Sequence, residues 1–175
     1  MAGCASLDGG DRKASARWFK RFVDKLGEEA AVDVNEMFAG ACPCRIEDEA
    51  VRRAREIHER AVDVKAFVAE MSRQKVIGRR IWYDEADATI YITKLYARDC
   101  GGGYPGGEGL IAGRCHCDYV NASTEQIPMG YCHCAAGFFR PMFAPLFGHD
   151  VVIEPVETVL SGGEECTFAV RLQGV

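Results

Sequence analysis

The spacing of apolar residues predicts helices over most of the first 75 residues. From Arg12 to about Ala31, apolar side chains recur every three or four positions, which is the spacing of one helix face. Asp63 is suited to cap a shorter helix that carries Phe67, Val68 and Met71. Between these two segments, a helix is expected after Pro43, and its buried stripe would consist of Ile46, Ala50, Val51, Ala54 and Ile57.

The period of the apolar pattern then changes from about 3.6 to 2, which is typical of strands. The alternating residues are Ile81 and Tyr83, then Ile90, Ile92 and Leu95, with acidic turn-forming residues between them. This pattern predicts a β-hairpin. Residues 96–130 follow and are so rich in glycine that we expect a loop, whose length is typical of a functional segment.

Helical spacing returns at residues 131–148, which carry an aromatic stripe. We expect this helix to be kinked or broken near Pro141, because an interior proline lacks a backbone donor and clashes with the preceding turn. The stripe either belongs to the core or lines a small-molecule pocket between helix and sheet. Its candidate ligand-binding residues are Phe138, Phe139 and Phe143.

Two more strands are expected at the C-terminal end, Val151–Leu160 and Cys166–Leu172, joined by a turn at Gly162 and Gly163. Pro155 places the first of them at a sheet edge or a bulge. Since Cys166 alternates in phase with Phe168, Val170 and Leu172, we expect its thiol to be buried on the core face.

The order of these elements predicts an α+β fold, with a helical N-terminal half packed on a four-stranded antiparallel sheet. The strands would follow the order strand, strand, Cys/Gly-rich loop, helix, strand, strand. We divide the chain into a helical region, 1–75, and an α+β region, 76–175, that form one compact unit.

Charge and hydropathy narrow the classes of partner. The 175 residues carry a net charge of −5, and the C-terminal half is acidic, which argues against binding to a nucleic-acid backbone. The sequence contains neither a signal-peptide pattern nor an apolar run long enough to span a membrane, so we expect a cytoplasmic protein without a membrane partner.

The nine cysteines are the main candidates for chemistry. Thiols in the cytoplasm are kept reduced, which favours metal binding or redox chemistry over permanent disulfides. Cys-x-Cys pairs occur at Cys42 and Cys44, at Cys115 and Cys117, and at Cys132 and Cys134; the last two pairs are each part of a Cys-His-Cys tripeptide. The sequence assigns no role to the first pair.

In an extended chain, residues i and i+2 project to one side, so each Cys-His-Cys tripeptide would offer two thiolates on a common face. If the two pairs converge, Cys115, Cys117, Cys132 and Cys134 would form a tetrahedral sulfur site, suited to zinc in preference to an iron–sulfur cluster. The alternatives are a redox-active disulfide and buried, unreactive thiols.

The segment from Cys115 to Leu172 resembles a known family. Its sequence includes CHCDYVNASTEQIPMGYCHCAAGFFRPMF and VVIEPVETVLSGGEECTFAV, with an acidic residue at Glu157 near the end of a strand, a glycine turn and Cys166 after that turn. These features resemble the C-terminal part of the 4-vinyl reductase domain family and of the related L-2-amino-thiazoline-4-carboxylic acid hydrolase-like proteins, as well as cysteine-rich, uncharacterised bacterial proteins.

The resemblance implies an α+β fold, a homodimer and a small-molecule-binding role in which Glu157 occupies the family's acidic position. Pro141 and Pro145 depart from the family's continuous helix.

Three functions follow as hypotheses. The first is a ligand-binding or sensing domain whose cysteines hold a metal or respond to redox state. The second is a hydrolase of a small cyclic substrate, with a cysteine nucleophile or a metal-activated water. The third is a structural role, in which the cysteines attach the glycine-rich loop to the sheet.

Overall fold

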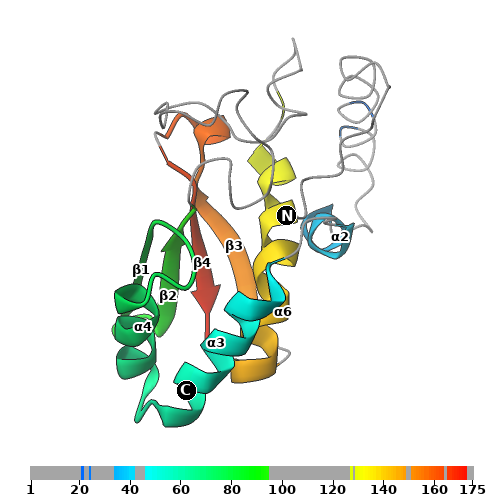
Figure 1. Ribbon diagram of the computed structural model, residues 1–175. Helices are drawn as coiled ribbons and strands as arrows, with labels where there is room; N and C mark the ends of the chain where they lie inside the picture. The colour runs from blue at the N-terminus through cyan, green and yellow to red at the C-terminus, as the bar shows by residue number, and fades with distance from the viewer. Residues whose placement is uncertain are drawn as a thin grey trace, which may run out of the picture.

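The computed structural model describes residues 21, 24, 34–41, 46–94, 127, 129–148, 151–163 and 165–172 (Figure 1). The helix expected from Arg12 to about Ala31 lies outside these residues, except for Arg21 and Asp24, which are helical. Most of the expected loop, 96–126, also lies outside them.

The described residues form an α+β fold with a four-stranded antiparallel sheet, as predicted. The strands are β1 (Arg80–Asp84), β2 (Thr89–Thr93), β3 (Val152–Glu157) and β4 (Thr167–Arg171). Their order across the sheet is β1-β2-β4-β3, and all three pairings are antiparallel. The two hairpins expected from the alternating pattern therefore join into one sheet through the contact of β2 with β4.

Pro155 lies in the edge strand β3, next to an irregularity in the pairing with β4. The register of β3 with β4 shifts between Pro155 and Glu157. Proline has no N–H to donate to a strand ladder, so edge strands and bulges are the positions that accept it. The prediction of an edge or a bulge is confirmed in both respects.

Two helices follow the predicted amphipathic pattern. Helix α3 (Asp48–Arg60) buries Ala54 and Ile57, and Ala50 and Val51 of the predicted stripe are partly buried. Ile46, the first residue of that stripe, is buried but lies before the helix begins. Helix α4 (Val64–Arg73) buries Phe67, Val68 and Met71, and Asp63 caps it by accepting a hydrogen bond of 2.7 Å from the Ala66 N–H. Both helices are placed by their apolar stripes, as the sequence predicted.

Helix α2 (Val34–Ala41) was not predicted as a separate element. It lies beside α6 (Cys134–Phe147), and the guanidinium of Arg140 on α6 donates to both carboxylate oxygens of Glu36, at 3.2 and 3.0 Å (Figure 1). An eight-residue helix has little propensity to form alone, so this packing on α6 is the main source of its stability.

Of the kink or break expected near Pro141, the break is wrong, because α6 continues through both Pro141 and Pro145 to Phe147, and the kink stays a prediction. The two prolines lie four residues apart and are both exposed, whereas Phe139 and Phe143 are fully buried. The carbonyl groups that lose a donor at these positions are therefore on the solvent side, where water can satisfy them. Burial of the opposite face outweighs the local cost of the prolines.

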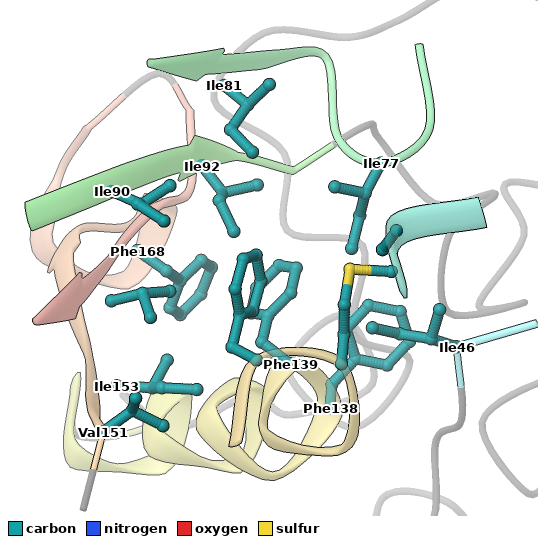
Figure 2. Packing of buried hydrophobic residues seen from close by; sticks show 14 of the residues in the cluster. Ile46, Ile77, Ile81, Ile90, Ile92, Phe138, Phe139, Val151, Ile153 and Phe168 are labelled. Carbon is teal, nitrogen blue, oxygen red and sulfur yellow. The ribbon is translucent and has the colours of Figure 1, made fainter. Parts of the chain in front are cut away.

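One hydrophobic core joins the sheet to the helices (Figure 2). Ile90 and Ile92 from β2, Phe168 from β4 and Phe139 from α6 are all at most 2% exposed, and the rings of Phe139 and Phe168 are 5.5 Å apart. The cluster also contains Ile57, Phe67 and Met71. Residues of 1–75 and of 76–175 thus share a single core.

An aromatic contact fixes the helices to one another. The imidazole of His58 on α3 meets the rings of Phe67 on α4 and Phe147 on α6 edge to face, with centroid distances of 5.5 and 5.0 Å. Such arrangements favour aromatic pairs beyond the area they bury. Within the described part of the chain, no helix has the length and apolar character needed to cross a bilayer.

Candidate functional site

The second Cys-His-Cys tripeptide lies where one helical segment becomes another. Cys132 and His133 end the 3₁₀-helix η1 (Met129–His133), and Cys134 is the first residue of α6. All three side chains are partly buried. Two of the predicted metal ligands, Cys132 and Cys134, therefore lie at the N-terminal end of α6, the helix that contributes Phe138, Phe139 and Phe143 to the core.

The extended geometry expected for this pair is wrong. In helical backbone each residue turns by about 100 to 120°, so side chains two positions apart point about 200 to 240° from each other. Cys132 and Cys134 consequently do not share one face, as they would in a strand. The backbone here is helical because the following residues pack as a helix against the sheet, which the Cys-x-Cys spacing does not reveal.

Cys115 and Cys117 lie outside the described residues, as do Cys42 and Cys44. The convergence of the two Cys-His-Cys pairs on one metal therefore stays a prediction. Among the residues that the structure describes, no group of three or more His, Cys, Asp or Glu side chains is arranged to hold a metal ion.

Lys94 is a feature of this region that the sequence analysis missed. It follows β2 directly and is only 8% exposed, and its Nζ lies 4.8 Å from the ring centroid of Phe138 on α6. Removing an ammonium group from water is costly, and the face of an aromatic ring offsets part of that cost. The sequence did contain a signal for this burial. Residue 94 is two positions after Ile92, so it has the same phase as Ile90 and Ile92, whose side chains face the core.

Cys166 lies opposite Lys94 across the β2–β4 pairing. Thr93 is paired with Thr167, and at the next position the Lys94 N–H donates to the Cys166 carbonyl oxygen at 2.9 Å. Directly opposite residues of antiparallel strands project to the same face, with Cβ atoms about 4.5 to 5.5 Å apart. Cys166 is 8% exposed and belongs to the core cluster, so the prediction of a buried thiol is confirmed.

Three elements thus meet at this end of the sheet. The end of β2 supplies an amine, the residue before β4 supplies a thiol, and the second turn of α6 supplies the ring of Phe138. Cys134 precedes Phe138 by one helical turn. We call these four residues, Lys94, Cys134, Phe138 and Cys166, the sheet-end cluster.

The predicted ligand-binding residues lie in two different environments. Phe138, Phe139 and Phe143 are at most 3% exposed and belong to the core cluster. Figure 2 shows Phe138 and Phe139 on α6 among these residues. Glu157 is exposed at the end of β3, against Gly163, where an added Cβ would lie 2.5 Å from its Oε1. Of these four, only Phe138 belongs to the sheet-end cluster.

Charged groups elsewhere in the described residues pair at the surface. Two hydrogen bonds from Arg73 and one from Gln74 lower the pKa of Glu70 to about 2. A hydrogen bond to Asp87 and partial desolvation raise the pKa of Tyr91. These shifts stem from ion pairs and hydrogen bonds on the surface of α4 and the β1–β2 hairpin, away from the sheet-end cluster.

No protein-family model, curated protein or solved structure matches the chain. The resemblance to the 4-vinyl reductase domain family therefore remains a prediction from the residues quoted for it.

Proposed function

We propose that this protein is a cytoplasmic small-molecule-binding or sensing domain whose cysteines bind metal or respond to redox state. The observation that carries the proposal is the position of Cys132 and Cys134. Both residues are partly exposed, Cys132 in η1 and Cys134 at the start of α6, and Cys134 lies one turn before Phe138, which contacts the buried Lys94.

The electrostatics of the sheet-end cluster support an anionic partner for this region. Helical backbone runs from η1 directly into α6, so the partial positive charge of the helix dipole lies at the η1 end, within about one turn of Cys132. The ammonium of Lys94 adds a positive charge beside Phe138, one turn after Cys134. A thiolate at Cys134, or a carboxylate or phosphate of a small ligand, is the charge type that this environment stabilises.

A thiolate is also the form in which cysteine binds metal and is oxidised. Zinc is the ion that four thiolates, from Cys115, Cys117, Cys132 and Cys134, would suit best. Binding one ion with all four would require the backbone between Cys132 and Cys134 to rearrange, because their side chains point in different directions in the helical turn. The reducing environment of the cytoplasm, where we expect this protein, would keep such thiols available for metal binding or oxidation.

The position of Cys132 in η1 and of Cys134 at the start of α6 supports sensing. The body of this helix supplies Phe138, Phe139 and Phe143 to the core, and η1 contacts α2, β3 and η2 (Val159–Ser161). Packed interiors transmit small displacements because they have few voids. A metal or an oxidised sulfur at Cys132 or Cys134 would therefore act on the helix that joins all these elements.

The test is metal analysis of the full-length protein purified without oxygen, combined with a count of reactive thiols before and after peroxide treatment. We expect either about one zinc per chain, lost in Cys132→Ser and Cys134→Ser, or a reversible loss of reactive thiols that involves these two residues. Cys166→Ala is the matched control, because it removes a buried cysteine and should change neither result.

A protein that carries no metal, and whose Cys132 and Cys134 react no differently from Cys166, would overturn the proposal. Hydrolysis of a small cyclic amide or thiazoline that is abolished by Cys134→Ser would replace the sensing function with the hydrolase alternative.

A further inference from the structure

The edge strand β1 has a charge pattern that is complementary to itself. Its five residues are Arg80, Ile81, Trp82, Tyr83 and Asp84, so a positive charge begins the strand and a negative charge ends it. If two copies of this strand lie antiparallel with Trp82 at the centre, Arg80 of each copy faces Asp84 of the other. Arg79 and Glu85, just outside the strand, continue the same pattern. Within one chain, Arg79 and Arg80 pair with Glu165, and Glu85 pairs with Lys65. Because the side chains of Arg80 and Glu85 are both 62% exposed, these surface pairs are weak and can be exchanged for partners in a second copy.

The two edges of the sheet differ in their capacity to pair. Among the described residues, β1 has a strand neighbour, β2, on one side only, and β3 forms the opposite edge. Edge strands are often protected by proline or by a bulge. The edge at β3 has both features near Pro155, whereas β1 has no proline and pairs with β2 in a regular register.

The solvent-exposed face of β1 carries an aromatic side chain, Trp82, that a second copy of the strand would partly cover. Trp82 is 39% exposed and stacks on Tyr91 of β2, with ring centroids 5.2 Å apart and planes 14° apart. The guanidinium of Arg80 lies 5.7 Å from the Trp82 ring centroid. A strand pair centred on Trp82 would bring the two indoles side by side and extend this aromatic row across both molecules.

The charges fix the register of such a pair. With Trp82 opposite Trp82, both ends of β1 have an oppositely charged partner. If the centre moves to Ile81, Arg80 faces a tryptophan and Asp84 has no partner within the strand. Opposite charges in directly facing positions stabilise antiparallel strands, and like charges destabilise them. A hydrophobic face likewise restricts strand register.

We propose that β1 is the interface for a second copy of this chain, paired antiparallel across a two-fold axis. The four strands of each copy would then form one continuous sheet. Such an interface is isologous, which is the commonest form of homodimer, and its backbone hydrogen bonds would satisfy the outer edge of β1.

The test exchanges the charges at the two ends of β1 and measures dimer dissociation by sedimentation equilibrium. We expect the wild-type chain to have twice the mass of one chain. Arg80→Glu and Asp84→Arg should each weaken the dimer about tenfold or more, since each change places like charges opposite one another at two symmetric positions. The double variant restores both attractions, so its dissociation constant should return toward that of the wild type.

Arg55→Glu is the matched control, because it makes the same charge change on the exposed face of α3 and should leave the dimer intact. Arg80→Glu also breaks the ion pair of Arg80 with Glu165 in the same chain, whereas Arg79 retains its own pair with Glu165. Circular dichroism and thermal unfolding therefore verify that each variant folds. Excess reductant excludes disulfide-linked dimers.

A monomeric wild type would overturn the proposal. So would a dimer that both single variants leave unchanged, or a double variant that is no tighter than either of them. The assay does not depend on Cys132 or Cys134, so its outcome is separate from that of the proposed function.

Discussion

The Nζ of Lys94 lies 4.8 Å from the ring centroid of Phe138, and this contact joins the end of β2 to the second turn of α6. Lys94 is 8% exposed and Phe138 is 3% exposed, so the interaction takes place almost entirely out of water. A cation over an aromatic face is worth more when it is desolvated. The pair therefore couples the sheet to the helix that begins at Cys134.

This coupling can be measured with a double-mutant cycle of Lys94→Met and Phe138→Leu. We expect the two changes to be non-additive in the free energy of unfolding by about 0.5 to 2 kcal/mol, the range for a cation–π contact. Phe143→Leu, which removes an equally buried ring from the same helix, is the control and should be additive with Lys94→Met. Urea denaturation gives all the values, and additivity in the Phe138 cycle would rule out the contact as a source of stability.

A second prediction concerns the reactivity of the described thiols. Cys166 is 8% exposed, whereas Cys132 and Cys134 are partly exposed, so a thiol reagent should modify Cys166 last in the native protein. Cys166→Ser should lower the free energy of unfolding by about 1 to 3 kcal/mol, because it buries a hydroxyl in an apolar core. Cys166→Ala separates this effect from the loss of volume. Mass spectrometry of time-resolved labelling checks the order, and rapid modification of Cys166 would contradict its burial.

Gly78, just before β1, is expected to tolerate no side chain. Its φ is +68°, and an added Cβ would lie 2.8 Å from both the Thr93 carbonyl oxygen and Cγ2 of Ile92. Both atoms are held by the β-sheet, so Gly78→Ala should destabilise the protein by about 2 kcal/mol or more.

Gly40→Ala is the control for Gly78→Ala, because we expect it to cause no loss of stability. Gly40 lies in α2, and an added Cβ would meet nothing within 4 Å. Alanine is preferred to glycine in helices by about 1 kcal/mol, so this variant should be at least as stable as the wild type. Thermal unfolding of both variants makes the comparison, and equal melting temperatures would show that the backbone at residue 78 adjusts without cost.

A fourth prediction concerns stability in acid. The pKa of Glu70 is lowered to about 2 from the ordinary 4.5, chiefly by the hydrogen bonds from Arg73 and then by that from Gln74. Because the folded-state pKa lies below the unfolded one, the stabilisation is present above about pH 4.5 and is lost as the pH falls toward 2. Glu70→Gln should therefore remove part of the loss of stability between these values.

Arg73→Gln tests the same ion pair from the other side and should flatten the acid dependence in the same direction. Glu70 is on the protein surface, so 1 M salt should reduce the effect in the wild type. Urea midpoints at several pH values between 5 and 3 check both variants. An acid dependence unchanged in Glu70→Gln would mean that other carboxylates account for it.

The partial success of the sequence analysis at the sheet-end cluster has a physical cause. The burial of Cys166 was predictable because its neighbours alternate in phase with it, and this requires only the period of a strand. Lys94 has the same phase as Ile90 and Ile92, but charged residues are rarely buried, and composition gives no sign of the ring of Phe138. Its burial became evident only when α6 and the end of β2 were placed together.

Local features of the sequence determined the elements of this protein. The helical period of α3, α4 and α6, the alternation in the strands, the Asp63 cap and the edge position of Pro155 all depend on residues near each other in the chain, and the described residues agree with these predictions. The helix expected from Arg12 to about Ala31 lies almost entirely outside the described residues, and α2 was not predicted. The tertiary structure decided the strand order β1-β2-β4-β3, the continuity of α6 through Pro141 and the helical backbone at Cys132 and Cys134. Each of these depends on burial against segments distant in the chain, and that energy outweighs local preference.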